Sequence, residues 1–305
     1  MGLGSRMDTT EGQAPAKPGN VQGFALSDPK YVFGDLILPG ATRGQIDRAL
    51  AFQRHQDLVF RQWGLKDTHR NAKRICLNFY GPPGTGKTMA AHAVASELGK
   101  KLLIVNYAEI ESKYVGETPK NLVSMFRRAE ETDAVIFFDE ADALLSKRVT
   151  NMSNATDTSV NQTRSVLLNL LNDYEKTILF ATNFIENFDP AFMRRILAHV
   201  HFTLPDEVCR RQLYALYVPR TMPHTIDFNT IARAHDDLSG SDIANAVLLA
   251  AFSAAERGAR MVQHADLDSA VLSILAGKRA NGGKTQTVTR EVSAEYAAQA
   301  IRGTA

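Results

Sequence analysis

The stretch GPPGTGKT, residues 81–88, decides the fold class of this chain. It fits the pattern G-x-x-x-x-G-K-[ST], and it stands between the short apolar run ICLNFY at 75–80 and a helical pattern that extends to about Leu98. Its glycines let the backbone curl so that N–H groups converge on phosphate oxygens, and the following helix adds the positive end of its dipole. The stretch therefore predicts a phosphate-binding loop between a strand and a helix.

The loop also predicts its ligand. The Lys87 ammonium would reach the β- and γ-phosphates of a nucleotide, and the Thr88 hydroxyl would ligate Mg²⁺. The rest of the loop would surround the phosphates with backbone groups: Gly81, Pro82, Pro83, Gly84, Thr85 and Gly86. We therefore expect ATP or ADP with Mg²⁺ as cofactors, and a chance glycine-rich turn is the alternative.

Strands and helices alternate on both sides of this loop. Further apolar runs predict strands at residues 102–105, 134–139, 177–182 and 199–204. The run AVIFFD at 134–139 is continuous, which is typical of a strand buried on both faces. A helix is expected to begin near Thr118 as its N-cap, with Pro119 in its first position. The alternation predicts an α/β domain whose parallel sheet is flanked by helices.

The sequence predicts four parts. Residues 1–28 are expected to be a disordered tail, because nothing there could bury enough surface to order it. Residues 29–205 would hold the α/β nucleotide-binding domain, with a helix over 46–63 ahead of its first strand. A small all-helical domain would occupy residues 206–277, with helices at 206–217, 228–235, 241–257 and 265–277. Residues 278–305 would be a polar tail.

The composition is that of an ordinary globular protein, with 44% hydrophobic and 22% charged residues. The net charge of +2 is too small to indicate a nucleic-acid partner from bulk charge alone. Cys76 and Cys209 fit no metal-binding spacing, so reduced thiols are expected. The sequence shows neither a signal peptide nor a membrane-spanning run, and we expect a cytoplasmic protein without membrane insertion.

Two carboxylates follow the apolar run that ends in IFFDEAD. Asp139 and Glu140 would lie at the carboxyl end of a parallel strand, where open α/β sheets bind their ligands. We expect Asp139 to hold Mg²⁺, directly or through water, and Glu140 to act as general base on the attacking water. The alternative is a helix N-terminus that favours acids, and Asp142 is interpreted as such a helix-start charge.

The order of GPPGTGKT, KYVGET, IFFDEAD, FATN and FDPAFMRR resembles the AAA ATPases, and the branch with spastin, katanin, the proteasomal ATPases and the FtsH-type proteases in particular. The resemblance covers residues 33–275. It implies an α/β nucleotide domain followed by a helical lid. It also implies a homo-oligomeric ring, usually hexameric, with ATP at the subunit interfaces.

The resemblance also assigns roles to a polar residue and a pair of arginines. Asn183 matches the first sensor, which would bind the γ-phosphate or the attacking water; a strand-ending turn residue is the alternative. Arg194 and Arg195 match the arginine fingers that reach a neighbouring subunit, and the sequence does not decide between them.

Weaker matches concern the base and the lid. Asp35, in FGDLILP, falls where the family wraps its backbone around the adenine. Gly240 and Ser241 match the lid segment that packs against the nucleotide, where related proteins usually carry Gly-Ala.

Tyr114 and Val115, in KYVGET, match the first pore loop of rings that thread polypeptides. An aromatic ring grips irregular side chains by area, which suits a motor that pulls many substrates. Packing of Tyr114 against its own sheet is the alternative. The polar stretch 146–159 is either a second pore loop or a plain surface loop.

Three functions remain open. The leading one is a ring-forming ATPase that couples hydrolysis of Mg²⁺-ATP to the unfolding, threading or remodelling of protein substrates through a central pore. The second is an AAA ATPase acting on nucleic acid, which Lys113, Lys147 and Arg148 favour by offering cations to phosphates. The third is a nucleotide-dependent switch or scaffold for a partner complex. The sequence names no substrate, and a separate adaptor could recruit one.

Overall fold

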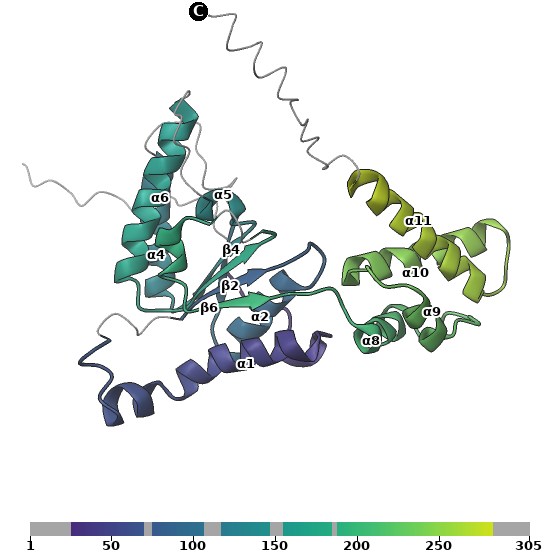
Figure 1. Ribbon diagram of the computed structural model, residues 1–305, viewed down its shortest axis with the longest axis horizontal. Coiled ribbons are helices and arrows are strands. Elements are labelled where there is room, and N and C mark those ends of the chain that lie inside the picture. The colour runs from purple at the N-terminus through teal and green to yellow at the C-terminus, as the bar shows by residue number, and fades with distance from the viewer. Residues whose placement is uncertain (1–25, 70–74, 107–116, 147–154, 185–187, 283–305) are drawn as a thin grey trace, which may run out of the picture.

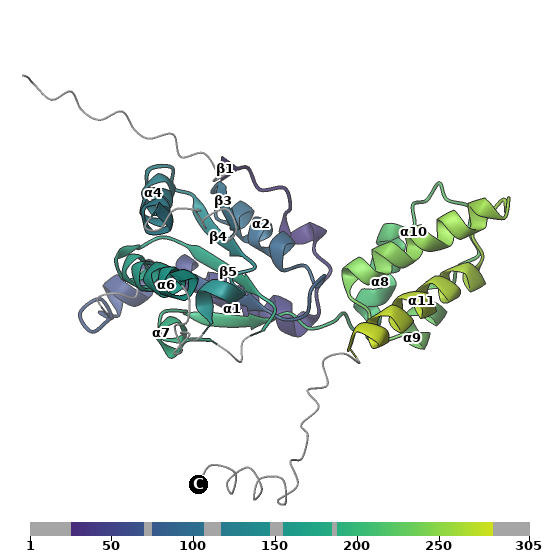
Figure 2. The same ribbon diagram turned by 90° about the horizontal axis from the view of Figure 1, so that it is seen from above.

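The computed structural model describes residues 26–69, 75–106, 117–146, 155–184 and 188–282. They form an α/β unit that ends with strand β6 (Ala198–His201) and a helical unit that begins with helix α8 (Glu207–Tyr217) (Figure 1). Seen from above in Figure 2, the helical unit lies beside the α/β unit.

The described part of the α/β unit contains a six-stranded sheet in the order β1-β3-β4-β5-β2-β6. The strands are β1 (Leu26–Ser27), β2 (Cys76–Tyr80), β3 (Leu102–Asn106), β4 (Val135–Asp139), β5 (Ile178–Thr182) and β6. β1 pairs antiparallel with β3, and all other neighbours pair in parallel. The predicted α/β fold is confirmed, and the parallel strands bring the carboxyl ends of β2, β4 and β5 to one edge.

Helices pack on both faces of the sheet (Figure 1). Their bounds are α1 (Gly40–Arg54) and α2 (Lys87–Glu97) on one face, and α4 (Glu117–Glu131) and α6 (Ala155–Asp173) on the other. Phe137 is buried in the core beneath α1 and α2, and Phe138 is buried in the core beneath α4 and α6. β4 is continuously apolar because successive side chains enter opposite cores.

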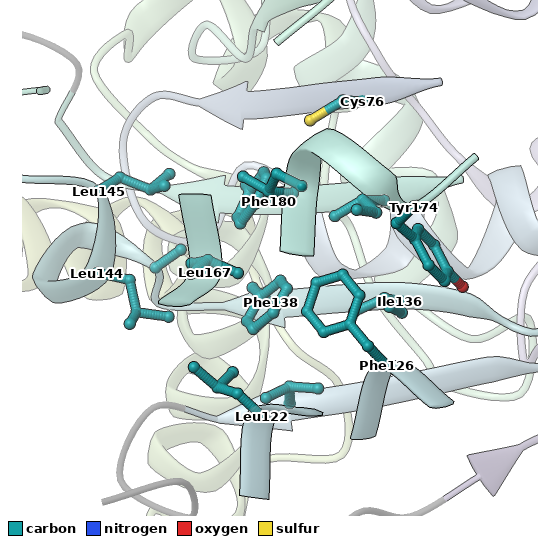
Figure 3. Packing of buried hydrophobic residues seen from close by; sticks show 14 of the residues in the cluster. Cys76, Leu122, Phe126, Ile136, Phe138, Leu144, Leu145, Leu167, Tyr174 and Phe180 are labelled. Atoms are coloured by element: carbon teal, nitrogen blue, oxygen red, sulfur yellow. The ribbon is translucent and has the colours of Figure 1, made fainter. Parts of the chain in front are cut away.

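Figure 3 shows the core between the sheet and helices α4 and α6. Phe138 of β4 and Phe180 of β5 stack with their ring centroids 5.1 Å apart. Phe126 of α4 meets Tyr174 edge-on, also at 5.1 Å. Packing of this kind holds β4 and β5 side by side, and it thereby sets the positions at which Asp139 and Asn183 leave the sheet.

The helical unit contains α8, α9 (Phe228–Ala234), α10 (Gly240–Glu256) and α11 (His264–Gly282), which confirms the predicted helical C-terminal region. Three of these helices begin at a capping side chain that accepts a backbone hydrogen bond, namely Asp206, Asp227 and Ser239. Tyr214 and Ile243 are fully buried in the core that the helices share.

The N-terminal boundary differs from the expectation. Leu26 and Ser27 form β1 within the predicted tail, and Leu26 packs against the core. The helix predicted over 46–63 is α1, which begins at Gly40, followed by a π-helical turn η2 (Leu58–Gln62) and preceded by a 3₁₀ turn η1 (Phe33–Asp35). The first turn of α1 carries no apolar stripe, so hydrophobic periodicity did not reveal it.

Other boundaries also shift. α4 begins at Glu117, so the prediction that Thr118 caps it is wrong by two residues, and Thr118 is buried in the first turn. α11 continues to Gly282, past the expected boundary at 277. Short helices α5 (Asp142–Leu145) and α7 (Pro190–Met193) follow β4 and precede β6. Residues 1–25 and 283–305 of the predicted tails lie outside the described residues.

Candidate nucleotide-binding site

A cavity of about 410 Å³ opens at the carboxyl edge of the sheet, and its walls come from both units. Most residues that the sequence assigned to the nucleotide line it: Asp35, Pro83, Gly84, Thr85, Gly86, Lys87, Thr88, Asp139, Glu140, Asn183, Gly240 and Ser241. Gly81, Pro82, Arg194 and Arg195 are not among its walls. The fold thus brings the predicted phosphate, metal and lid residues to one place.

The loop between β2 and α2 needs glycine at two points. Gly84 has a φ of +74°, and a Cβ there would lie 2.0 Å from the Ser241 hydroxyl oxygen. Gly81 has a φ of +144°, and a Cβ there would lie 2.0 Å from the backbone oxygen of Phe202. A side chain at either position would collide with these neighbours, and the positive φ also favours glycine.

The Lys87 ammonium is held inside the loop. Its Nζ donates to the backbone oxygens of Gly81 at 2.7 Å and Pro82 at 3.0 Å, and to Asn183 Oδ1 at 3.0 Å. Gly81 and Pro82 therefore contact the lysine rather than the cavity. The phosphates of a nucleotide would lie beside an ammonium that the loop already orients.

The side chains of Thr88 and Asp139 meet at the edge of the cavity. The Thr88 hydroxyl donates to Asp139 Oδ2 at 2.9 Å, and the backbone N–H of Glu140 donates to Asp139 Oδ1 at 3.0 Å. A hydroxyl and a carboxylate are hard oxygen donors that suit Mg²⁺. No group of three or more His, Cys, Asp or Glu side chains in the described part of the chain could hold a metal. Mg²⁺ commonly takes its other ligands from substrate phosphates and water.

Glu140 stands at a sharp turn directly after β4. Its φ is +51°, a left-handed conformation that residues other than glycine rarely adopt.

Burial lowers the pKa of Lys87 from its ordinary value of 10.5, while the carboxylates of Asp139 and Asp142 oppose that shift. The site therefore combines a desolvated cation with several acids at the end of one strand.

Asp142 has more contacts than a helix-start charge requires. Its carboxylate accepts hydrogen bonds from the backbone N–H groups of Asn183, at 3.1 Å to each oxygen, and of Phe184, at 3.2 Å. It lies in the first turn of α5, as expected, but the groups it binds belong to the end of β5. The spacing of the sequence carried no signal for this long-range contact.

One wall of the cavity is apolar, and sequence reasoning missed it. Ile37 and Leu38 contribute from the segment before α1, and Leu213, Leu216 and Tyr217 contribute from α8. Such a surface suits the flat base of a nucleotide. The spacing of the three α8 residues, which places them on one side of a helix, was the available signal.

The polar part of this wall includes Asp35, Gly240 and Ser241, which matched the family pattern only weakly in sequence. Asp35 lies in η1, where its carboxylate accepts the backbone N–H of Val32 at 2.8 Å. From the helical unit, the Ser241 N–H donates to Gly84 O at 3.4 Å, and the hydroxyls of Ser239 and Ser241 are 3.0 Å apart. The helical unit thus contacts the phosphate loop directly.

The two arginines differ in their surroundings. Arg195 donates to Asn172 Oδ1 at 2.8 Å and to Ala191 O at 2.7 Å, within its own chain. Arg194 is exposed, and its guanidinium forms no hydrogen bond or ion pair among the described residues. Tyr114 and Val115 lie outside those residues, as does most of the stretch 146–159.

The comparison with protein families agrees with this geometry. A family model described as "ATPase family associated with various cellular activities (AAA)" matches residues 77–204. These residues form an AAA ATPase domain. The resemblance stated from the motifs is thereby confirmed, and the domain is a nucleotide-binding one.

Several curated proteins that are similar in sequence to this chain are named as proteasome regulatory subunits. The chain is 37% identical over 172 residues to a probable 26S proteasome regulatory subunit 4 of Caenorhabditis elegans, covering 54% of this chain and 39% of the relative. It is 34% identical over 210 residues to a 26S proteasome regulatory subunit 4 homolog of Dictyostelium discoideum, covering 66% of this chain and 47% of the relative. A homolog from Oryza sativa subsp. japonica is also 34% identical, over 209 residues, with 66% and 46% covered.

The AAA domain and its flanking residues span less than half the length of these relatives. Among the residues that the structure describes, no helix combines the length and the apolar character needed to cross a bilayer.

Proposed function

We propose that this chain is the motor part of a ring-forming ATPase, which hydrolyses Mg²⁺-ATP to ADP and phosphate in order to unfold, thread or remodel protein substrates. The observation that carries the proposal is the cavity in which Lys87, Thr88, Asp139, Glu140 and Asn183 line walls shared with the helical unit. These side chains are the types needed to bind a γ-phosphate and to activate a water against it.

Each residue has a distinct task in this proposal. Lys87 binds the β- and γ-phosphates, and Asn183 orients the water. Glu140 accepts a proton as the water oxygen bonds to the γ-phosphorus and the bond to the bridging oxygen of ADP breaks. Thr88 and Asp139 would hold Mg²⁺, which supplies neutralisation of the charge on the phosphates.

The arginines support assembly into a ring. The guanidinium of Arg194 is exposed, has no partner among the described residues and does not line the cavity of its own chain, which suits a group offered to a neighbouring subunit. Such a finger supplies roughly 10³–10⁵ in rate where it has been measured in other NTPases. Arg195 instead donates hydrogen bonds to Ala191 of α7 and Asn172 of α6, and so links these two helices. The ring would contain copies of this chain or related subunits.

Protein is the proposed substrate because the matched relatives are named as regulatory subunits of the 26S proteasome. Tyr114 and Val115 would then grip an extended chain. The net charge of +2 gives no support to a nucleic-acid substrate, which stays the second candidate. We further propose a cytoplasmic location and recruitment through a tail or an adaptor.

The first experiment compares Glu140→Gln with Glu131→Gln, an exposed glutamate at the end of α4. The Glu140 variant should bind ATP and lose hydrolysis by about 100-fold or more, because the water keeps its proton. The Glu131 variant should match the unmodified chain. Normal turnover by Glu140→Gln would contradict the assigned role of the base, and absence of turnover in the unmodified chain would remove the proposed activity.

The second experiment captures the substrate. Glu140→Gln loaded with ATP would be isolated from its native cell, with and without nuclease treatment. Unfolded protein that resists nuclease and disappears when Tyr114→Ala is added would support a polypeptide-threading motor. Material that depends on nucleic acid would favour the second candidate instead.

A further inference from the structure

We infer that Asp142 is a positioning residue for hydrolysis, because its carboxylate fixes the peptide that carries Asn183 and, through it, the Asn183 side chain beside Lys87. The inference rests on the proposed ATPase function and deepens it. It gives a task to a residue that the sequence assigned only to the start of a helix.

The contact is made by both oxygens of the carboxylate. Asn183 N donates to Oδ1 and Oδ2 of Asp142 at 3.1 Å each, and Phe184 N donates to Oδ1 at 3.2 Å. Hydrogen bonds to an ionised acceptor are about twice as strong as neutral ones. Two successive N–H groups held by one carboxylate set the direction in which the chain leaves β5.

Apolar packing does not perform this task at the end of β5. Phe180 and Ala181 are buried in the two cores, but Phe184 is 72% exposed. The large side chain that follows Asn183 therefore buries little surface that could anchor the peptide. The carboxylate of Asp142 supplies the anchor at the point where core packing ends.

Asp142 is itself held firmly. The preceding residue, Ala141, donates its backbone N–H to Ala181 O at 2.9 Å, which ties the turn to β5. Leu144 and Leu145 of the same helix are buried in the core beside α6. The position of Asp142 is thus fixed by the core, and the carboxylate transmits that position to Asn183.

The end of this chain of contacts is the Lys87 ammonium. Asn183 Oδ1 accepts from Lys87 Nζ at 3.0 Å, and both side chains line the cavity. A misplacement of a reacting or orienting group by about 1 Å costs on the order of 100-fold in rate. Asp142 therefore acts on this contact through hydrogen bonds.

The test measures steady-state ATP hydrolysis and ADP affinity by calorimetry for the full chain. Asp142→Ala should lower kcat by about 10- to 100-fold and change the Kd for ADP by less than about 3-fold, because ADP has no γ-phosphate for Asn183 to contact. Asp142→Asn keeps one oxygen acceptor for these backbone N–H groups and should lose less than Asp142→Ala. Asp227→Ala is the control, since Asp227 also accepts a backbone N–H, from Asn229 at 2.9 Å, but lies outside the cavity.

A double-mutant cycle separates positioning from a general structural effect. Because Asp142 acts through Asn183, the double variant Asn183→Ala/Asp142→Ala should be no slower than Asn183→Ala alone. Thermal melts identify a variant that does not fold, in which case Asp142→Asn takes the place of Asp142→Ala in the cycle. Additive losses, or an unchanged kcat in Asp142→Ala, would overturn the inference while hydrolysis by the unmodified chain stands. An inactive unmodified chain would instead remove the proposed function, and this inference with it.

Discussion

The hydroxyl of Thr88 lies 2.9 Å from the carboxylate of Asp139, and this hydrogen bond joins residues 51 positions apart in the chain. Thr88 belongs to the first turn of α2, after β2, and Asp139 is the last residue of β4. β5 lies between these two strands in the sheet, so the contact spans the carboxyl edge at which the nucleotide would bind. The structure thus brings together two side-chain oxygens that could bind a metal ion.

Thr88→Val removes the hydroxyl with little change of shape. We expect it to lower kcat/KM for Mg²⁺-ATP by roughly 100-fold, because Mg²⁺ loses one of its two protein oxygens. ATPase rates over a Mg²⁺ titration would measure the change. Thr88→Ser retains the hydroxyl and should stay within a few-fold of the unmodified chain, and an equal loss in both variants would contradict the metal assignment.

Gly84→Ala tests the contact between the phosphate loop and the helical unit. The new Cβ would lie 2.0 Å from the Ser241 hydroxyl and 2.7 Å from that of Ser239, so these serine side chains or the helix that carries them must move. Nucleotide affinity should fall by about 10-fold or more, as measured by calorimetry with ADP. Gly99→Ala is the matched control, because Gly99 also has a positive φ, +64°, but no neighbour within 4 Å.

The control should lose only about 1 kcal/mol of stability from the left-handed backbone and should keep its affinity for ADP. Equal affinity in Gly84→Ala and Gly99→Ala would mean that the contact with Ser241 does not influence the nucleotide.

Arg194→Ala tests whether the exposed guanidinium of Arg194 acts on a neighbouring subunit. Hydrolysis should fall by about 10³-fold if Arg194 is the finger. Lys87→Ala should also be inactive, because it removes the cation of the phosphate loop. Mixing the two inactive variants should restore part of the activity, since an intact loop then meets an intact arginine across an interface.

Asn172→Ala and Arg195→Ala are the comparison for this experiment. Both break the contact between Arg195 and Asn172 and should reduce stability without the loss of hydrolysis expected of Arg194→Ala. Failure of the Arg194 mixture to regain activity, with recovery in the Arg195 mixture, would reverse the assignment of the two arginines.

His92 makes the N-terminal segment sensitive to acid. Its Nδ1 accepts the backbone N–H of Lys30 at 3.3 Å, and its ring meets Tyr31 edge-on at 5.8 Å. Burial, with a smaller contribution from Lys30, lowers the pKa of His92 below its ordinary value of 6.5. The unfolded chain therefore binds the proton more readily, so stability is full above pH 6.5 and is lost as the pH falls toward the lowered pKa.

Thermal melts above and below pH 6.5 would compare the unmodified chain with His92→Gln, which cannot titrate. We expect the unmodified chain to lose more Tm on acidification than the variant, and to lose nucleotide affinity with it, because the segment leads directly to Asp35 in the cavity wall. Parallel acid profiles for the two proteins would exclude a role for His92.

Much of the fold follows from local patterns. The continuous run at 134–139 predicted a strand buried on both faces, and Phe137 and Phe138 occupy opposite cores. Strand periodicity depends on neighbours two residues apart, so sequence patterns report it well. Boundaries without an apolar stripe, such as the start of α1 at Gly40 and the pairing of β1 at Leu26, were not predicted.

The amino-acid sequence by itself determined the phosphate loop, the acids after β4 and the division into an α/β and a helical unit, because turn chemistry and hydrophobic periodicity act over a few residues. Only the tertiary structure decided that Asp142 binds the end of β5, that Ser241 contacts Gly84, and that Arg194 rather than Arg195 has a free guanidinium within the described residues. These contacts join segments far apart in the chain. They depend on the order of the strands and the packing of the helices, which bring distant residues within hydrogen-bonding distance.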